Sequence, residues 1–221
     1  MAVVVLLGAP GAGKGTQAGA IGRHLGIPHV ATGDLFRAAV SEGSTIGREA
    51  RRYMERGQLV PDDITIRMLL DRLGQPDARG GAVLDGFPRT RAQAQVLDEA
   101  LDATGSHVDR ALLIDVPAEN LVRRLSGRWI CQAAGHVYHA TANPPRVEGV
   151  CDLDGSPLVQ RTDDREETIR ARLAGQLGAL EDVVDHYRSR GVLRTVDGTQ
   201  PIDAVSDALL AELPAAPGSR A

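Results

Sequence analysis

A continuous apolar stretch at the start of the chain, followed at once by closely spaced glycines, most constrains the fold. Residues 2–7 (AVVVLL) are apolar at every position, which predicts a strand buried on both of its faces. The glycine-rich segment 8–13 comes next, and helical periodicity then continues to about Leu25. A strand buried on both faces needs helices on each side of its sheet, so we expect an α/β protein with a parallel sheet.

Strand-like and helix-like segments alternate along the rest of the chain. Further strands are predicted at 29–31, 82–85, 111–116 and 192–196. Helices are predicted at 34–42, 45–55, 61–73, 90–101, 117–126, 165–187 and 202–213. This alternation indicates βαβ units, and parallel sheets of this kind bind ligands beyond the carboxyl ends of their strands. With 221 residues, 43% of them hydrophobic, the chain can bury a sizeable core without disulfides or metals.

The spacing within residues 8–14 (GAPGAGK) is typical of a phosphate-binding P-loop. Its glycines let several backbone N–H groups face one anion, and the following helix adds the positive end of its dipole. Lys14 is the only lysine among 25 basic residues, and its compact ammonium is suited to reach the outer phosphates. The usual pattern continues with Ser or Thr, whereas here Gly15 stands before Thr16.

Composition argues against several other classes of protein. The formal net charge is −4, and there are only one Trp, three Tyr and two Phe, so neither a basic field nor a base-stacking platform favours nucleic acid. No apolar run approaches the roughly 20 residues of a membrane span. The chain starts without the basic segment of a signal peptide, and Cys131 and Cys151 do not make a disulfide framework. We expect a monomer in the cytoplasm, without nucleic-acid or membrane partners.

Several motifs resemble those of the adenylate kinases, a nucleoside monophosphate kinase family. The matching segments are 8–16 (GAPGAGKGT), 32–37, 58–62, 85–90 (DGFPRT), Gln93, 127–128, 143–145, 161–164, Arg172 and 196–199. The glycine between lysine and threonine is itself typical of this family. The resemblance covers roughly residues 1–213, and the insert at 127–164 has the length of the long-form lid.

The resemblance implies a P-loop core with two insertions. The core would consist of residues 1–30, 61–126 and 165–214, with a small helical AMP-binding insertion at 31–60, a β-rich lid at 127–164 and a flexible tail at 215–221. The implied activity is reversible transfer of the terminal phosphoryl group of ATP to AMP, which gives two ADP, with Mg²⁺ accompanying ATP. Both insertions are expected to close over their nucleotides and exclude water.

Site residues carry over position by position. The implied catalytic residues are Lys14, Asp85, Arg89, Arg128, Arg161 and Arg172, and Asp85 ends a predicted strand in the manner of a carboxylate near Mg²⁺. The implied ATP contacts are Gly11, Ala12, Gly13, Lys14, Gly15, Thr16, Arg124, Arg128, Val137, Tyr138 and Gln200. The implied AMP contacts are Thr32, Arg37, Gln58, Leu59, Val60, Gly86, Phe87, Pro88, Arg89, Gln93, Arg161 and Arg172. Solvated surface charges are expected at Arg48, Arg51, Arg52 and Arg56.

Three other functions remain as alternatives to weigh. A related kinase would act on UMP or CMP, or use GTP as donor, and Thr32 and Gln93 favour AMP over these acceptors. A GTPase switch needs a guanine-reading Asn-Lys-x-Asp motif, which a chain with Lys14 as its only lysine does not have. A nucleotide-binding module without catalysis would not need so many arginines around one phosphate site.

Structural zinc in the lid is a separate question. Zinc-bearing relatives have Cys-x2-Cys followed by Cys-x2-Cys or Cys-x2-Asp, and the corresponding positions here are Cys131, Ala134, Cys151 and Asp154. Ala134 cannot ligate; His136, two residues away, could supply a nitrogen, but its backbone position is not that of the motif. We therefore expect two packed free thiols and no metal, with Cys131, Cys151 and Asp154 as the residues that would ligate zinc.

Overall fold

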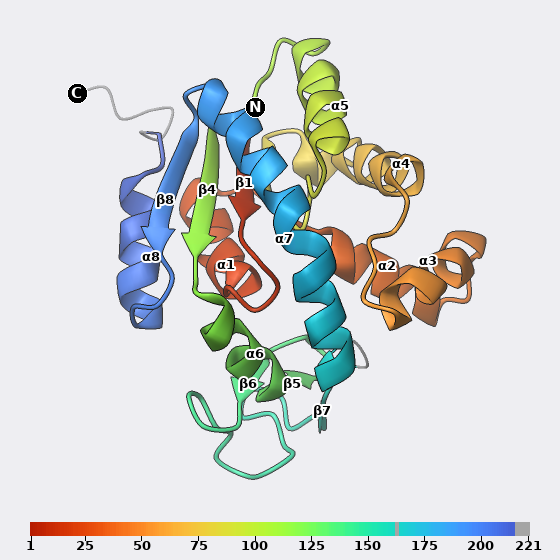
Figure 1. Ribbon diagram of the computed structural model, residues 1–221, viewed down its shortest axis with the longest axis vertical. Helices are drawn as coiled ribbons and strands as arrows, with labels where there is room; N and C mark the ends of the chain where they lie inside the picture. The colour runs from red at the N-terminus through yellow and green to blue at the C-terminus, as the bar shows by residue number, and fades with distance from the viewer. Residues whose placement is uncertain (162–163, 215–221) are drawn as a thin grey trace.

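The computed structural model describes residues 1–161 and 164–214, and it has a parallel sheet at its centre (Figure 1). In that part of the chain the sheet has five strands in the order β2-β3-β1-β4-β8. Their bounds are β1 Ala2–Leu7, β2 His29–Ala31, β3 Gly81–Asp85, β4 Arg110–Asp115 and β8 Leu193–Asp197. Residues 162–163 of the expected lid and the expected tail 215–221 lie outside the described residues.

Helices cover both faces of the sheet and complete two apolar cores. The helices are α1 Lys14–Leu25, α2 Thr32–Ser41, α3 Thr45–Glu55, α4 Asp62–Leu73, α5 Arg91–Asp102, α6 Ala118–Ser126, α7 Glu166–Ser189 and α8 Ile202–Ala211. Val4 and Leu6 of β1 pack in the core that includes residues of α1, α6 and α8. Val3, Val5 and Leu7 pack in the core that includes residues of α4, α5 and α7. Because successive side chains of a strand point to opposite faces, residues 2–7 must be apolar throughout.

Two smaller units extend from the sheet. Helices α2 and α3 belong to one of them, which has a small core of Phe36, Ala50, Val60 and Ile64. The other is an antiparallel sheet in the order β6-β5-β7, with bounds β5 Arg128–Cys131, β6 Val137–His139 and β7 Leu158–Val159. Figure 1 shows the first unit at the right of the central sheet and the second below it.

The predicted fold class is confirmed. The predicted strands and helices are present, and their ends differ from the prediction by only a few residues. Helix α2 begins at Thr32 rather than at 34, and α7 continues to Ser189 rather than ending at 187. A 3₁₀ turn at Pro76–Ala78 was not predicted. Among the helices of the described residues, none has both the length and the apolar character needed to cross a bilayer.

Two glycines allow a direct test of the packing between α2 and α3. A Cβ on Gly47 of α3 would lie 2.0 Å from the carbonyl oxygen of Ala39 in α2, so only glycine permits this close approach. Gly178 lies on the exposed face of α7, where a Cβ would have no atom within 4 Å. We expect Gly47→Ala to lower the free energy of unfolding by about 1–3 kcal/mol. Gly178→Ala should instead raise it by up to about 1 kcal/mol, because alanine favours a helix.

Urea titration of the two variants measures both effects. A Gly47→Ala protein as stable as the parent would contradict the described contact between α2 and α3.

Candidate active site

The glycine-rich segment and Lys14 lie where β1 ends and α1 begins. Gly13 occupies the N-cap position of α1, and Lys14 is the first residue of that helix. The Lys14 ammonium folds back over the loop and donates hydrogen bonds to the carbonyl oxygens of Gly8 (2.7 Å) and Ala9 (3.1 Å). A cation and a helix N-terminus therefore meet at one position, which suits a phosphate group.

Lys14 lies in a strongly positive environment. Burial lowers the pKa of its ammonium to about 8, and Arg89, Arg172 and Arg128 act in the same direction, while the charge of Asp85 opposes them. The three arginines come from separate parts of the chain: the segment before α5, helix α7 and strand β5. Their convergence concentrates positive potential beyond the carboxyl ends of β1 and β3.

Asp85 ends β3 directly beside the phosphate loop. A Cβ on Gly15 would lie 3.4 Å from its Oδ2, and His29 Nε2 lies 3.4 Å from the same oxygen. Burial by itself would raise the pKa of Asp85, but the hydrogen bond from His29 and the charge of Lys14 outweigh it and lower that pKa. Asp85 is therefore held ionised next to the loop, and an ionised carboxylate suits Mg²⁺ or its bound waters.

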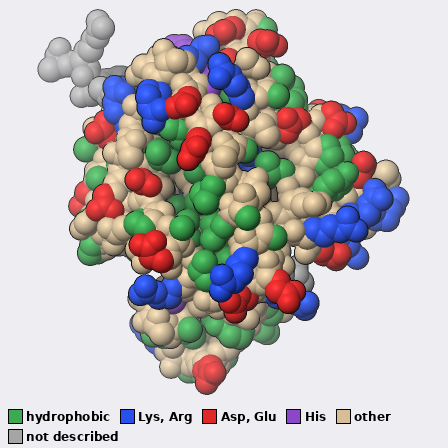
Figure 2. Space-filling view, in the orientation of Figure 1, with side chains coloured by type: hydrophobic (Ala, Val, Ile, Leu, Met, Phe, Trp, Pro, Cys, Tyr) green, Lys and Arg blue, Asp and Glu red, His purple; other side chains and the backbone are tan. Residues whose placement is uncertain are grey.

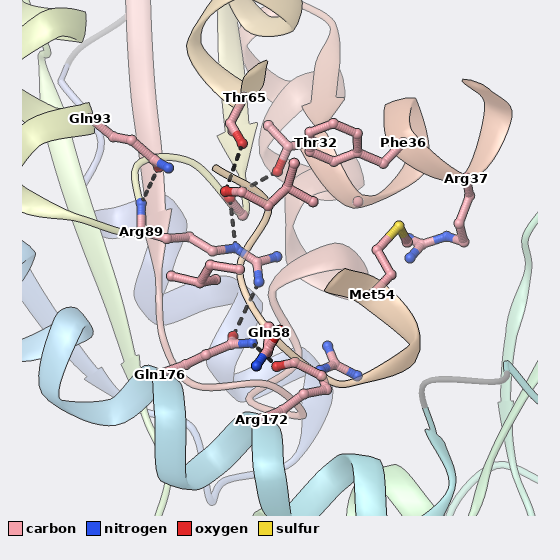
Figure 3. A pocket seen from close by; sticks show the side chains of 15 residues that line it. Thr32, Phe36, Arg37, Met54, Gln58, Thr65, Arg89, Gln93, Arg172 and Gln176 are labelled. Carbon is pink, nitrogen blue, oxygen red and sulfur yellow. Dashed lines mark hydrogen bonds between the residues drawn. The ribbon is translucent and has the colours of Figure 1, made fainter. Parts of the chain in front are cut away.

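A polar pocket opens between α2, the turn after α3 and the segment that follows β3 (Figure 3). The predicted AMP contacts that line it are Thr32, Arg37, Gln58, Leu59, Val60, Gly86, Arg89, Gln93 and Arg172. The carbonyl oxygen of Gly86 accepts hydrogen bonds from Thr32 Oγ1 and Arg89 Nε, each at 2.8 Å. A single backbone group thereby orients two side chains of the pocket. A neighbouring hollow beside the phosphate loop shares Gly86, Arg89 and Arg172 with this pocket, so the two cavities adjoin.

Gln93 is buried and already makes two hydrogen bonds within the protein. Its Oε1 accepts from the backbone N–H of Arg89 at 2.8 Å, and its Nε2 donates to Asp62 Oδ1 at 2.7 Å. Asp62 also accepts a hydrogen bond from Thr90 Oγ1 at 2.8 Å. An amide has a second lone pair and a second hydrogen, so Gln93 retains one acceptor and one donor position for a ligand.

Three of the predicted catalytic arginines form ion pairs with aspartates. Arg128 makes a bidentate ion pair with Asp164, at 2.7 and 2.5 Å, and Arg172 Nη1 lies 3.6 Å from Asp164 Oδ1. The Asp164 side chain is fully buried, so it orients two predicted catalytic arginines from within the protein. Arg161 Nη2 lies 3.4 Å from Asp34 Oδ1, and Asp34 belongs to α2.

Several predicted site residues lie away from this centre. Phe87 is buried in the core formed with α4, α5 and α7, and Tyr138 is buried in the small core of the antiparallel sheet. Arg124 donates a hydrogen bond to the carbonyl oxygen of Gly198 at 2.8 Å, which brings it near the loop that carries Gln200. Val137 is exposed on β6. Pro88, by contrast, lines the hollow beside the phosphate loop and so lies at this centre.

The arginines of α3 are surface charges, as expected. Side chains at positions 48, 51, 52 and 56 are all exposed. In Figure 2, basic side chains gather on the outer part of the unit at the right, where Figure 1 places α3. A group of exposed arginines therefore does not indicate the active site, whereas arginines that lie near Lys14 do.

Four side chains of the small sheet form a compact cluster of metal-ligating groups. One ligand atom from each of Cys131, His136, Cys151 and Asp154 lies within 4.8 Å of every other. His136 Nδ1 lies 3.3 Å from Cys151 Sγ and 3.4 Å from Asp154 Oδ2, and Cys131 Sγ lies 3.2 Å from Asp154 Oδ2. Both cysteines are free thiols. His136, which the sequence offered as a nitrogen ligand outside the motif's position, takes part in this cluster, whereas Ala134 contributes no ligand.

Sequence patterns also gave no role to Gln176 or Asp164. Gln176 lines both cavities, and Asp164 lies between two catalytic candidates. Asp164 belongs to the segment 161–164, which matches the adenylate kinases, and this match is the sequence signal that could have identified it. Gln176 lies one helical turn after Arg172, and that i, i+4 spacing was its only signal.

Comparisons with known proteins show the family of the chain. A model of the family described as "Adenylate kinase" matches residues 6–192. The chain belongs to the adenylate kinase family. It is 46% identical to an adenylate kinase of Lachnospira eligens over 94% of this chain and 97% of that protein. It is 50% identical to one of Streptomyces griseus over 87% and 89%, and 49% identical to one of Exiguobacterium sibiricum over 91% and 94%.

The pKa of Lys14 predicts how this kinase responds to pH. Phosphate binding needs the protonated ammonium, so kcat/KM for MgATP should fall about tenfold per pH unit above a pKa of about 8. Bound phosphates favour the charged form, so kcat should begin to fall only at higher pH. Steady-state rates measured between pH 6 and 10 with saturating AMP test this. A kcat/KM that stays flat to pH 10 would show that Lys14 is not the titrating phosphate ligand.

Proposed function

We propose that the two adjoining cavities hold the two substrates of an ATP:AMP phosphotransferase, with the phosphates meeting at Lys14 and Arg89. Membership of the adenylate kinase family makes this activity, which yields two ADP, the function of the chain. The observation that carries the site assignment is that Lys14, Arg89 and Arg172 line one hollow beside the phosphate loop. The charge of Arg128 also contributes to the lowered pKa of Lys14. ATP would occupy the side of the phosphate loop, with AMP in the pocket of Figure 3.

The proposed chemistry depends on charge stabilisation and alignment. A transferring phosphoryl group spreads negative charge over its equatorial oxygens, and guanidiniums contact such oxygens in pairs. Arg128, Arg161 and Arg172 are assigned to this group, Arg37 and Arg89 to the phosphate of AMP, and Arg124 to the adenine of ATP. The acceptor phosphate is already an anionic nucleophile, so no side chain is assigned as a general base.

Mg²⁺ enters this scheme as part of the MgATP substrate. Asp85 is ionised and adjacent to Gly15, so it is suited to hold the ion through its bound waters. No observation favours UMP, CMP or GTP over the adenine nucleotides.

We further propose that the two smaller units are the moving parts. Residues 31–60 would close over AMP and 127–164 over ATP, against a core of 1–30, 61–126 and 165–214. Support comes from their separate small cores and from the placement of Arg37 and Arg161 in them. We also propose that the protein is a monomer in the cytoplasm.

Replacing Lys14 tests the assignment of the transferring phosphates. Lys14→Met should lower kcat about 10²-fold or more, because it removes a preorganised charge, while nucleotide affinity falls less. Lys14→Arg should also lower kcat, because the larger guanidinium does not fit over the carbonyl oxygens of Gly8 and Ala9. Arg79→Met, an exposed change remote from both cavities, is the matched control. A coupled assay of ADP formation measures all three, and near-normal turnover of Lys14→Met would refute the assignment.

The lid cluster favours a structural zinc ion, contrary to the expectation from Ala134. Tetrahedral zinc with bonds of about 2.0–2.3 Å keeps its ligand atoms about 3.3–3.8 Å apart. Three separations in this cluster, of 3.2, 3.3 and 3.4 Å, are close to that range, and all four ligand atoms lie within 4.8 Å of one another. Metal binding requires deprotonated ligands. Hydrogen bonds from Ser156 hold the pKa of Asp154 well below its usual range, and those from Tyr138 and His136 lower the pKa of Cys151 although burial acts to raise it.

Zinc content and chelator sensitivity test this proposal. Untagged protein should contain about one zinc per chain, and a strong chelator should lower its melting temperature. His136→Asn should lose the metal, whereas His107→Asn, at an exposed position outside the lid, should keep it. Adding Ala134→Cys to His136→Asn should restore binding, because the Ala134 N–H already lies 3.3 Å from Cys131 Sγ. Metal-free protein that melts identically with and without chelator would contradict the proposal.

A further inference from the structure

Gln176 of α7 lies where the two cavities meet. It lines both of them, together with Gly86, Arg89 and Arg172. Its Oε1 accepts a hydrogen bond from Arg89 Nη1 at 3.1 Å, and its Nε2 donates one to the carbonyl oxygen of Gly57 at 3.1 Å (Figure 3). A guanidinium only donates and a carbonyl only accepts, so these two partners fix the orientation of the amide.

The two partners of Gln176 belong to different segments of the chain, and both line the proposed AMP pocket. Gly57 precedes the turn 58–60, which the resemblance to the adenylate kinases implies is part of the pocket for the adenine of AMP. Arg89 is assigned to the AMP phosphate, and its Nε is already directed by the carbonyl oxygen of Gly86. One side chain therefore connects the part of the pocket that receives the base to the cation that receives the phosphate.

Helix α7 supports this connection along one face. A Cβ on Gly57 would lie 2.8 Å from Arg172 Cγ and 2.9 Å from the carbonyl oxygen of Thr168, so the turn packs tightly on the helix. The φ of Gly57 is +69°, which other residues rarely adopt. Thr168, Arg172 and Gln176 follow one another at intervals of four residues, which places them on the same face of α7. Gln176 adds a hydrogen bond to this close packing.

We propose that Gln176 is a positioning residue that holds the adenine-side turn and Arg89 at the spacing that AMP requires. The inference rests on the proposed assignment of the AMP pocket. Gln176 acts through Arg89 and Gly57, so its loss weakens AMP binding selectively. Glutamate is not an equivalent replacement, because it lacks the donor for Gly57 and its charge competes with the AMP phosphate for Arg89.

Substitutions at position 176 separate these effects. Gln176→Met keeps the length of the side chain without its hydrogen bonds, and KM for AMP should rise about five- to tenfold. KM for ATP should change less than about twofold. Gln176→Glu should raise KM for AMP further, because the added carboxylate pairs with Arg89. Gln75→Met is the matched control, since Gln75 is an exposed glutamine that donates to a backbone carbonyl outside both cavities.

A double variant shows whether Gln176 acts through Arg89. Arg89→Ala should raise KM for AMP strongly, and adding Gln176→Met to it should have much less effect than in the parent. If Arg89→Ala raises KM for AMP but Gln176→Met leaves it unchanged, or raises both KM values equally, the role of Gln176 is refuted and the pocket assignment stands. If Arg89→Ala leaves KM for AMP unchanged, the pocket assignment fails and the inference fails with it.

Discussion

Mutual repulsion among cations at the end of β1 is the constraint on which the architecture of this kinase depends. Lys14 shares the hollow beside the phosphate loop with Arg89 and Arg172, and the lowered pKa of its ammonium reflects burial and the repulsion of these two arginines and of Arg128. Such a cluster attracts polyphosphates strongly, but it is costly to assemble before they bind. The fold must therefore hold each cation in place through carboxylates and backbone carbonyl oxygens, and these groups make up most of the site.

The partners come from the ends of strands β1 and β3 and from the segment before α7. Buried Asp164 holds Arg128 and lies near Arg172, and backbone carbonyls hold Lys14 and Arg89. Parallel strands β1 and β3 end side by side, in register from Ala2 and Gly81 to Leu6 and Asp85. This register brings Asp85 to the phosphate loop and so places a carboxylate next to the ammonium. Preorganisation of this kind is the main way a protein accelerates phosphoryl transfer.

The fold and most of the residues around Lys14 could be predicted from the sequence, because both depend on local sequence patterns. The run 2–7 predicted its strand, and the spacing around Lys14 predicted the phosphate loop. Contacts that depend on how distant segments of the chain pack together could not be predicted in this way. The approach of Gln176 to Gly57 and the entry of His136 into the cysteine cluster follow from the path of a turn and the packing of a helix, which no local pattern encodes. Gln93 was expected to serve a nucleotide base, yet it also organises Arg89 and Asp62.

The most direct test of the central claim is a crystal structure with two adenosines joined by a chain of phosphates, which occupies both cavities at once. The expected result has the phosphate chain contacting Lys14, Arg89, Arg128, Arg161 and Arg172, with one adenine in the pocket of Thr32 and Gln93. Residues 31–60 and 127–164 should then lie closer to the core than in protein without the ligand. A phosphate chain that bypasses Lys14 and these arginines, or two units that stay in the same place, would contradict the account.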